Sequence, residues 1–287
     1  MTTPILCGTD FSENARQAAE VAAALASRLG AKLILAHSLD ERGEIPAHLR
    51  PQLRDSLGAQ LTTETARVRA LGAEVEEHLV GGVPDDGLLA LAARSGAQFI
   101  VLAASGTGAL GRWMLGSVAE STAESAPIPT LVVREAQSLL EWARGSRPLR
   151  ILAGVDFTAN SEAALRWLAG IREVGSCAIT LGFVDHDPDE GSEAPDATRD
   201  REDALRAMAG EILGDEPVSV FVRAGSARID AHLLRLADEW RADLIVVGTH
   251  QWRGMQRLRH ASVSRRLLRD AAVSVACIPD TKTQRSD

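Results

Sequence analysis

The residues best suited to chemistry lie in one glycine-rich stretch, residues 99–125. The four apolar residues at its start have the composition of a buried strand. Glycines follow at positions 106, 108, 111 and 116, and Ser117 then opens a run of helical composition. Glycine lets backbone N–H groups approach an anion closely, and a helix N-terminus carries about half a positive charge. The stretch therefore predicts a site for a phosphate group.

Motifs for catalysis or metal binding are missing from the sequence. No G-x-S-x-G, H-E-x-x-H or G-x-x-x-x-G-K-[ST] motif occurs. The cysteines, Cys7, Cys177 and Cys277, show no C-x-x-C spacing, and Cys7 and Cys277 fall in predicted strands, where we expect small buried apolar residues. We therefore expect neither catalytic residues nor a metal centre built from the protein alone.

The bulk composition restricts the classes of partner. A length of 287 residues predicts about two domains. The net charge of −8 argues against nonspecific binding of nucleic acid, which uses basic patches. No apolar run reaches the roughly 18 residues of a membrane span, and residues 1–10 lack the basic and apolar regions of a signal peptide. We expect a cytoplasmic protein that binds neither nucleic acid nor membrane.

Apolar strands alternate with helical stretches from the N-terminus onward. The pattern predicts strands at 4–8, 33–37, 74–80, 99–102 and 130–134, and helices at 15–29, 50–71, 85–95 and 117–125. Glycines at 30, 72 and 96 stand where a helix commonly ends. Such alternation predicts parallel strands joined by right-handed crossovers.

The pattern restarts after a break at residues 135–148, where Gly145, Ser146 and Pro148 favour a loop. ILAGVDFTANSEAALRWLAGI echoes ILCGTDFSENARQAAEVAAAL, so that Asp156 matches Asp10, and corresponding points lie 145 or 146 residues apart. The sequence therefore predicts two copies of one α/β domain, residues 1–140 and 148–281. Each copy is expected to be a five-stranded, parallel, doubly wound, Rossmann-like sheet with strand order 3-2-1-4-5.

The predicted strand order places the candidate residues of the first copy together. Ligands of doubly wound sheets bind beyond the carboxyl ends of the strands, where the strand order reverses. Here that point lies between strands 1 and 4, so Asp10 and the glycine-rich loop face one crevice. Two roles stay open for Asp10: it binds a ribose hydroxyl or a phosphate-bound metal ion, or it caps the helix that enters at Phe11.

This combination resembles the universal stress proteins, which have a strand-1 aspartate and a loop of the form G-x2-G-x9-G-[ST] after strand 4. The register here is Ala103-x2-Gly106-x9-Gly116-Ser117, so three of the four positions match. The resemblance covers both copies. It implies that the first copy binds ATP or another adenine nucleotide, with or without Mg²⁺. The implied contact residues are Thr9, Asp10, Ser38, Ala103, Gly106, Gly116, Ser117 and Val118.

Three positions depart from the family pattern. If the backbone at Ala103 has a positive φ, alanine destabilises that conformation by roughly 1–2 kcal/mol relative to glycine. If φ is negative, alanine is harmless. In the second copy the register reads Gly248-x2-Gln251-x9-Ala261-Ser262, so that side chains replace two glycines. We therefore expect a degenerate second site, of which Asp156, Gly248 and Ser262 remain.

The resemblance also implies a function and an assembly. It implies a stress-response binding or signalling module rather than an enzyme, and slow ATP hydrolysis is compatible with it. The alternative is a nucleotide-free scaffold for protein partners that the sequence does not identify. In the family the last strands pair at the sheet edge, so the strands at 130–134 and 273–277 should join the two copies. A homodimer is also compatible with this resemblance.

Overall fold

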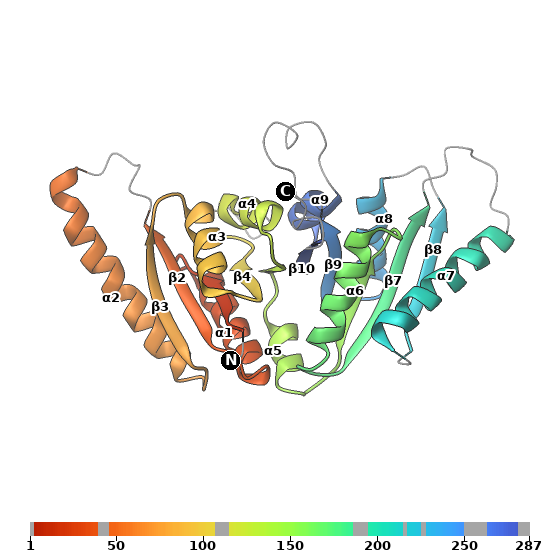
Figure 1. Cartoon of the computed structure of the whole chain (residues 1–287), viewed down its shortest axis with the longest axis horizontal. Helices are drawn as coiled ribbons and strands as arrows, with labels where there is room; N and C mark the ends of the chain where they lie inside the picture. The colour runs from red at the N-terminus through yellow and green to blue at the C-terminus, as the bar shows by residue number, and fades with distance from the viewer. Residues whose placement is uncertain are drawn as a thin grey trace.

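A single sheet of ten strands forms the middle layer of the molecule, with helices on both faces (Figure 1). The computed structural model describes residues 3–39, 46–106, 115–185, 195–214, 217–224, 228–249 and 263–280. The order of the strands is β3-β2-β1-β4-β5-β10-β9-β6-β7-β8. Read from its own first strand, each half has the order 3-2-1-4-5, which confirms the predicted fold of both copies.

The first copy follows the predicted elements closely. Its strands are β1 (Ile5–Gly8), β2 (Leu33–Leu39), β3 (Val75–Gly81), β4 (Phe99–Ala103) and β5 (Thr130–Val133). Its helices are α1 (Glu13–Arg28), α2 (Arg50–Arg69), α3 (Pro84–Ser95) and α4 (Ser117–Ser125), with a short 3₁₀ turn at Ala47–Leu49. Gly30, Gly72 and Gly96 have positive φ after the helices that they follow, as glycine permits.

The second copy repeats this order. Its strands are β6 (Leu149–Gly154), β7 (Cys177–Asp185), β8 (Ser219–Ala224), β9 (Leu244–Thr249) and β10 (Ser274–Pro279). Its helices are α6 (Ala159–Ile171), α7 (Pro195–Leu213), α8 (Ile229–Glu239) and α9 (Val263–Asp270). Neighbouring strands pair in parallel within each copy, whereas β5 and β10 pair antiparallel and join the copies, as expected for the two last strands. Among the described helices, none is both long and apolar enough to span a bilayer.

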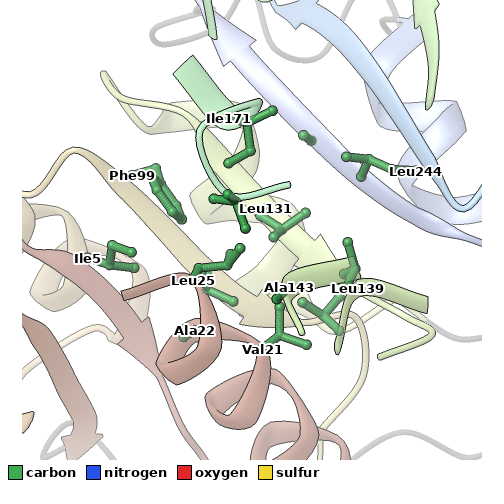
Figure 2. Close-up of a cluster of buried hydrophobic side chains, with 14 of the residues drawn as sticks. Ile5, Val21, Ala22, Leu25, Phe99, Leu131, Leu139, Ala143, Ile171 and Leu244 are labelled. Atoms are coloured by element: carbon green, nitrogen blue, oxygen red, sulfur yellow. The ribbon is translucent and has the colours of Figure 1, made fainter. Parts of the chain in front are cut away.

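The hydrophobic core is continuous from one copy to the other. On one face of the sheet, α1, α2, α5 (Gln137–Ala143), α6 and α7 contribute to one buried cluster, and α3, α4, α8 and α9 contribute to another on the opposite face. Figure 2 shows Leu25 and Leu131 of the first copy in the same cluster as Ile171 and Leu244 of the second. The two copies therefore share one core instead of meeting as separate globules.

A helix lies where the sequence analysis expected a loop between the copies. Helix α5 (Gln137–Ala143) contacts α1 and β6, and its Leu139 and Trp142 are buried in the shared core. The predicted end of the first domain, residue 140, falls inside this helix. Loop formers Gly145 and Pro148 do follow it. The connection is thus part of the packed core.

An ion-pair cluster anchors the chain just after α5. The carboxylate of Asp243, whose side chain is only 5% exposed, accepts hydrogen bonds from the Arg147 guanidinium at 2.8 and 3.0 Å and from the Arg150 amide at 2.9 Å. Burial alone would raise the pKa of Asp243, but these hydrogen bonds outweigh it and hold the pKa at about 2. The unfolded carboxyl titrates near pH 3.9. The contribution of the Asp243 carboxylate to the stability of the fold is therefore present above about pH 4 and is lost as the pH falls toward 2.

We expect Asp243→Asn to lower the free energy of unfolding by about 2 kcal/mol at pH 7, and by progressively less below pH 4. Urea unfolding at pH 7, 5 and 3 measures the difference. Glu162→Gln, which breaks the exposed Glu162–Arg166 pair, is the control and should cost less than about 1 kcal/mol. A difference for Asp243→Asn that stays constant from pH 7 to 3 would contradict the assigned pKa.

Candidate functional site

A cavity of about 450 Å³ lies at the carboxyl ends of β1, β2 and β4, between β1 and β4 where the strand order of the first copy reverses. Small-molecule sites commonly have volumes in this range. Every residue predicted for the first-copy site lines it, namely Thr9, Asp10, Ser38, Ala103, Gly106, Gly116, Ser117 and Val118. The fold therefore gathers residues that are more than 100 positions apart in the sequence around one cavity.

The turn between β1 and α1 holds Asp10 at the cavity. Phe11 has a φ of 64°, and its amide donates to Thr9 Oγ1 at 3.1 Å. The amide of Ser12 donates to Asp10 Oδ1 at 3.1 Å, and Ser12 Oγ accepts from the amide of Ala15 and caps α1. The capping role considered for Asp10 is therefore wrong, because Ser12 is the cap. Asp10 shapes the turn instead, with its carboxylate beside the cavity.

Gly106 is required by space and not by its backbone angles. It is not among the described glycines with positive φ. A Cβ at position 106 would lie 2.0 Å from Oδ2 of Asp10. The loop after β4 is further held by Asn14, whose Nδ2 donates to Ser105 Oγ at 2.9 Å. The strand-1 aspartate and the first matched glycine of the loop are thus in direct steric contact.

The N-terminus of α4 faces the same cavity. Gly116 is its N-cap residue, and among the described residues no side chain caps this helix. The amide of Gly116 donates to the carbonyl of Ala104 at 2.7 Å, so this amide is already used within the protein. The amides of Ser117 and Val118 lie in the first turn, where an α-helix offers no internal acceptor. Backbone binding of an anion would therefore rest on residues 117 and 118.

The structure answers the question about Ala103. The described non-glycine residues with positive φ are Phe11, Phe157 and Arg241, so Ala103 lies outside that region. Ala103 ends β4 in ordinary strand pairing with Val133. Alanine in place of the family's glycine therefore adds no backbone strain.

His37 is a cavity residue that the sequence analysis missed. Its Nδ1 lies 2.7 Å from the carbonyl oxygen of Thr9, and its ring packs on Phe11 with centroids 4.4 Å apart. A carbonyl only accepts, so Nδ1 carries the proton, and Nε2 of the neutral ring is an acceptor. The available signal was its position beside Ser38 at the end of a strand that borders the predicted crevice.

The equivalent region of the second copy is arranged differently. Asp156 Oδ1 accepts hydrogen bonds from the hydroxyls of Thr158 and Ser161, both at 2.6 Å. A Cβ on Gly248 would lie 2.6 Å from Cβ of Asn160, so α6 packs directly on the end of β9. Ser262, Gln251 and Ala261 lie outside the described residues. The predicted degeneracy of this copy remains a prediction.

The described residues offer little reactive chemistry. Burial, with a smaller contribution from a nearby glutamate, raises the pKa of both the Cys7 and the Cys277 thiol to about 12, so neither forms a thiolate near neutral pH. Among the described residues, no three His, Cys, Asp or Glu side chains are grouped as in a metal site.

The model of the universal stress protein family matches residues 1–134 and 149–279. The chain belongs to this family. A universal stress protein of Thermus aquaticus is 34% identical over 140 residues, which are 47% of this chain and 100% of that protein. The two matched segments coincide with the two halves of the sheet, so this is a universal stress protein with two tandem copies of the family fold.

Solved structures show the same fold over both copies. A universal stress protein from Archaeoglobus fulgidus covers 98% of this chain and 99% of its own, with a TM-score of 0.74 and 18% identity. Another universal stress protein, crystallised in complex with cAMP, is 28% identical and covers 47% of this chain and 98% of its own, with a TM-score of 0.39. The cAMP was bound by that protein.

Proposed function

We propose that the first copy of this universal stress protein binds an adenine nucleotide, ATP or a relative, with or without Mg²⁺. The observation that carries the proposal is the convergence of Asp10, Gly106, Ser117 and the other predicted residues on one cavity at the switch point of the sheet. The protein would then act as a stress-response module whose nucleotide occupancy is sensed by protein partners.

The chemistry of the cavity wall supports a ligand with an anionic and an apolar end. The N-terminus of α4, with the Ser117 hydroxyl, suits a phosphate group. The wall also contains apolar side chains of β2, β4 and α3, which suit the faces of a base: Ala36, Leu102, Pro84 and Leu88. Ser38 and His37 add polar atoms that a base edge would use.

We further propose that binding is not followed by rapid turnover. The hydroxyls of Thr9 and Ser105 accept hydrogen bonds from the amide of Phe11 and from Asn14 Nδ2, and neither of these bonds is to a general base that would take a hydroxyl proton. The competing proposal is a nucleotide-free scaffold, for which the substitutions in the second-copy loop argue. A slow ATP hydrolase is less well supported, because no catalytic grouping accompanies the site among the residues that the structure describes.

Nucleotide content and stoichiometry test the proposal. The purified full-length protein is denatured, any released nucleotide is identified by mass spectrometry, and ATP, AMP and cAMP are titrated calorimetrically with and without Mg²⁺. We expect one site per chain. Two sites per chain would mean that the second copy also binds, and no binding at millimolar nucleotide would leave the scaffold proposal. Sustained ATP turnover that Asp10→Ala abolishes would support the hydrolase.

A further inference from the structure

We call the place where β5 pairs with β10 and α4 contacts α9 the seam between the two copies. It has a pseudo-twofold axis. In the antiparallel pair β5·β10, Leu131 lies opposite Ala276, and these residues occupy equivalent positions 145 residues apart in the two copies. Thr130 pairs with Cys277 and Val132 with Val275, which the same exchange of copies interchanges. Helices α4 and α9 contact each other across this seam (Figure 1). Equivalent positions on the two helices therefore face each other.

Four charged residues occupy equivalent positions at this contact. Glu120 and Glu124 lie on α4, and Arg265 and Arg269 stand at the equivalent positions of α9, again 145 residues away. Arg265 Nε lies 2.7 Å from Glu120 Oε1 and 3.2 Å from Glu124 Oε1, and Arg269 Nη2 lies 2.8 Å from Glu120 Oε1. The first copy thus presents only acids at these positions, and the second copy only bases.

A like-with-like pairing would bring four charges of one sign together. Two first copies joined through β5 would place two Glu120 and two Glu124 carboxylates at the axis, and two second copies would place four guanidinium groups there. The glutamates are only 16% and 19% exposed, so water would screen their repulsion poorly. Like charges that face each other across an interface reject a wrong partner, and opposite charges attract the right one.

A hydrogen bond at the edge of the seam has the same asymmetry. The amide of Arg134 donates to Ser274 Oγ at 3.1 Å, and Arg134 Nη2 donates to the carbonyl of Leu268 at 2.8 Å. The residue equivalent to Ser274 in the first copy is Pro129, which has no hydroxyl, and the residue equivalent to Arg134 in the second copy is Pro279, which has no N–H. Neither like-with-like pairing can form the amide–hydroxyl bond.

We propose that the quartet Glu120, Glu124, Arg265 and Arg269 makes the seam selective for a first copy paired with a second copy. The partner that fits the β5 edge is the β10 edge of this chain or of another molecule of the same chain. Within one chain the two edges satisfy each other. A homodimer through these edges forms only when two chains exchange copies, and not by pairing two β5 strands or two β10 strands.

Charge reversal in the full-length chain tests the proposal. E120R/E124R makes the quartet all arginine, R265E/R269E makes it all glutamate, and the four substitutions together restore opposite charges in the reverse sense. We expect each double variant to unfold roughly 5 °C or more below wild type at low salt and to recover partly in 0.5 M NaCl. The quadruple variant should regain most of the lost unfolding temperature.

The control variant reverses the charge of two acidic residues that lie beside an arginine away from the seam. E202R/D203R removes the exposed contacts of Glu202 and Asp203 with Arg206 on α7 and should shift the unfolding temperature by less than a third as much. A quadruple variant as unstable as the doubles, or doubles as stable as wild type, would overturn the proposal.

Mixing the two double variants tests partner choice directly. When they are unfolded and refolded together, all-arginine and all-glutamate chains should form mixed dimers by exchange, seen by native mass spectrometry as the intermediate mass. Each variant unfolded and refolded alone should form no exchanged dimer. A mixture that refolds without mixed dimers would show that the quartet does not select partners.

Discussion

Gly106→Ala is expected to weaken adenine-nucleotide binding at least tenfold while leaving the fold intact. A Cβ at position 106 would lie 2.0 Å from Oδ2 of Asp10, far inside van der Waals contact. Either the carboxylate or the loop after β4 must move, and both line the cavity. Binding sites need their contact groups held within about half an ångström. A tenfold loss corresponds to about 1.4 kcal/mol of binding free energy.

The control for Gly106→Ala is the same substitution at Gly58. Gly58 lies inside α2, and a Cβ there would meet no atom within 4 Å. Gly58→Ala should therefore leave the dissociation constant unchanged and stabilise the protein by about 0.4–1 kcal/mol through a less flexible unfolded chain. Calorimetric titration of ATP into both variants makes the comparison. Equal affinities for the two variants would mean that the ligand does not depend on the Asp10–Gly106 contact.

The sequence was sufficient to predict which elements meet at the cavity. Strand-helix alternation and the repeat predicted two doubly wound copies, and the order 3-2-1-4-5 expected for such a sheet places Asp10 next to the loop that ends at Ser117. Both residues stand at the ends of elements with strong local signals, an apolar strand and a glycine-bounded helix. Position along a well-patterned element therefore predicts which residues share a site.

The sequence did not predict the side-chain contacts between elements. The ring of His37 packs on Phe11, which has a positive φ in the turn between β1 and α1, and the sequence did not indicate this contact. The close approach of α6 to Gly248 depends on where Asn160 lies on its helix. The opposite charges of α4 and α9 are visible in the repeat, but their meaning requires knowing that these helices face each other.

Helix α5 was missed for a related reason. It has only seven residues, too few for helix propensity to be decisive, and its N-cap residue, Ala136, has no capping group, so that the first amides of the helix donate to Glu135 instead. Its position next to Gly145 favoured a loop. The helix is formed because Leu139, Leu140 and Trp142 are buried together against α1 and the start of β6. Tertiary packing thus decides this segment.

Trp142→Ala is expected to produce the largest loss of stability, about 3–5 kcal/mol. Trp142 is one of the largest fully buried side chains, with 1% of its surface exposed, and it belongs to the core cluster that both copies share. Gly175, in the turn before β7, packs so closely that a Cβ there would lie 2.9 Å from the indole Nε1. Alanine would leave a cavity where the first copy, α5 and the second copy meet.

Trp142→Phe separates packing from hydrogen bonding at this position. Within the part of the chain that the structure describes, the indole N–H has no acceptor, so phenylalanine removes no hydrogen bond and keeps most of the buried apolar surface. We expect it to cost less than half as much as alanine. Urea unfolding followed by far-ultraviolet circular dichroism measures both variants. Because the core is continuous, a Trp142→Ala protein within about 1 kcal/mol of wild type would show that α5 does not hold the two copies together.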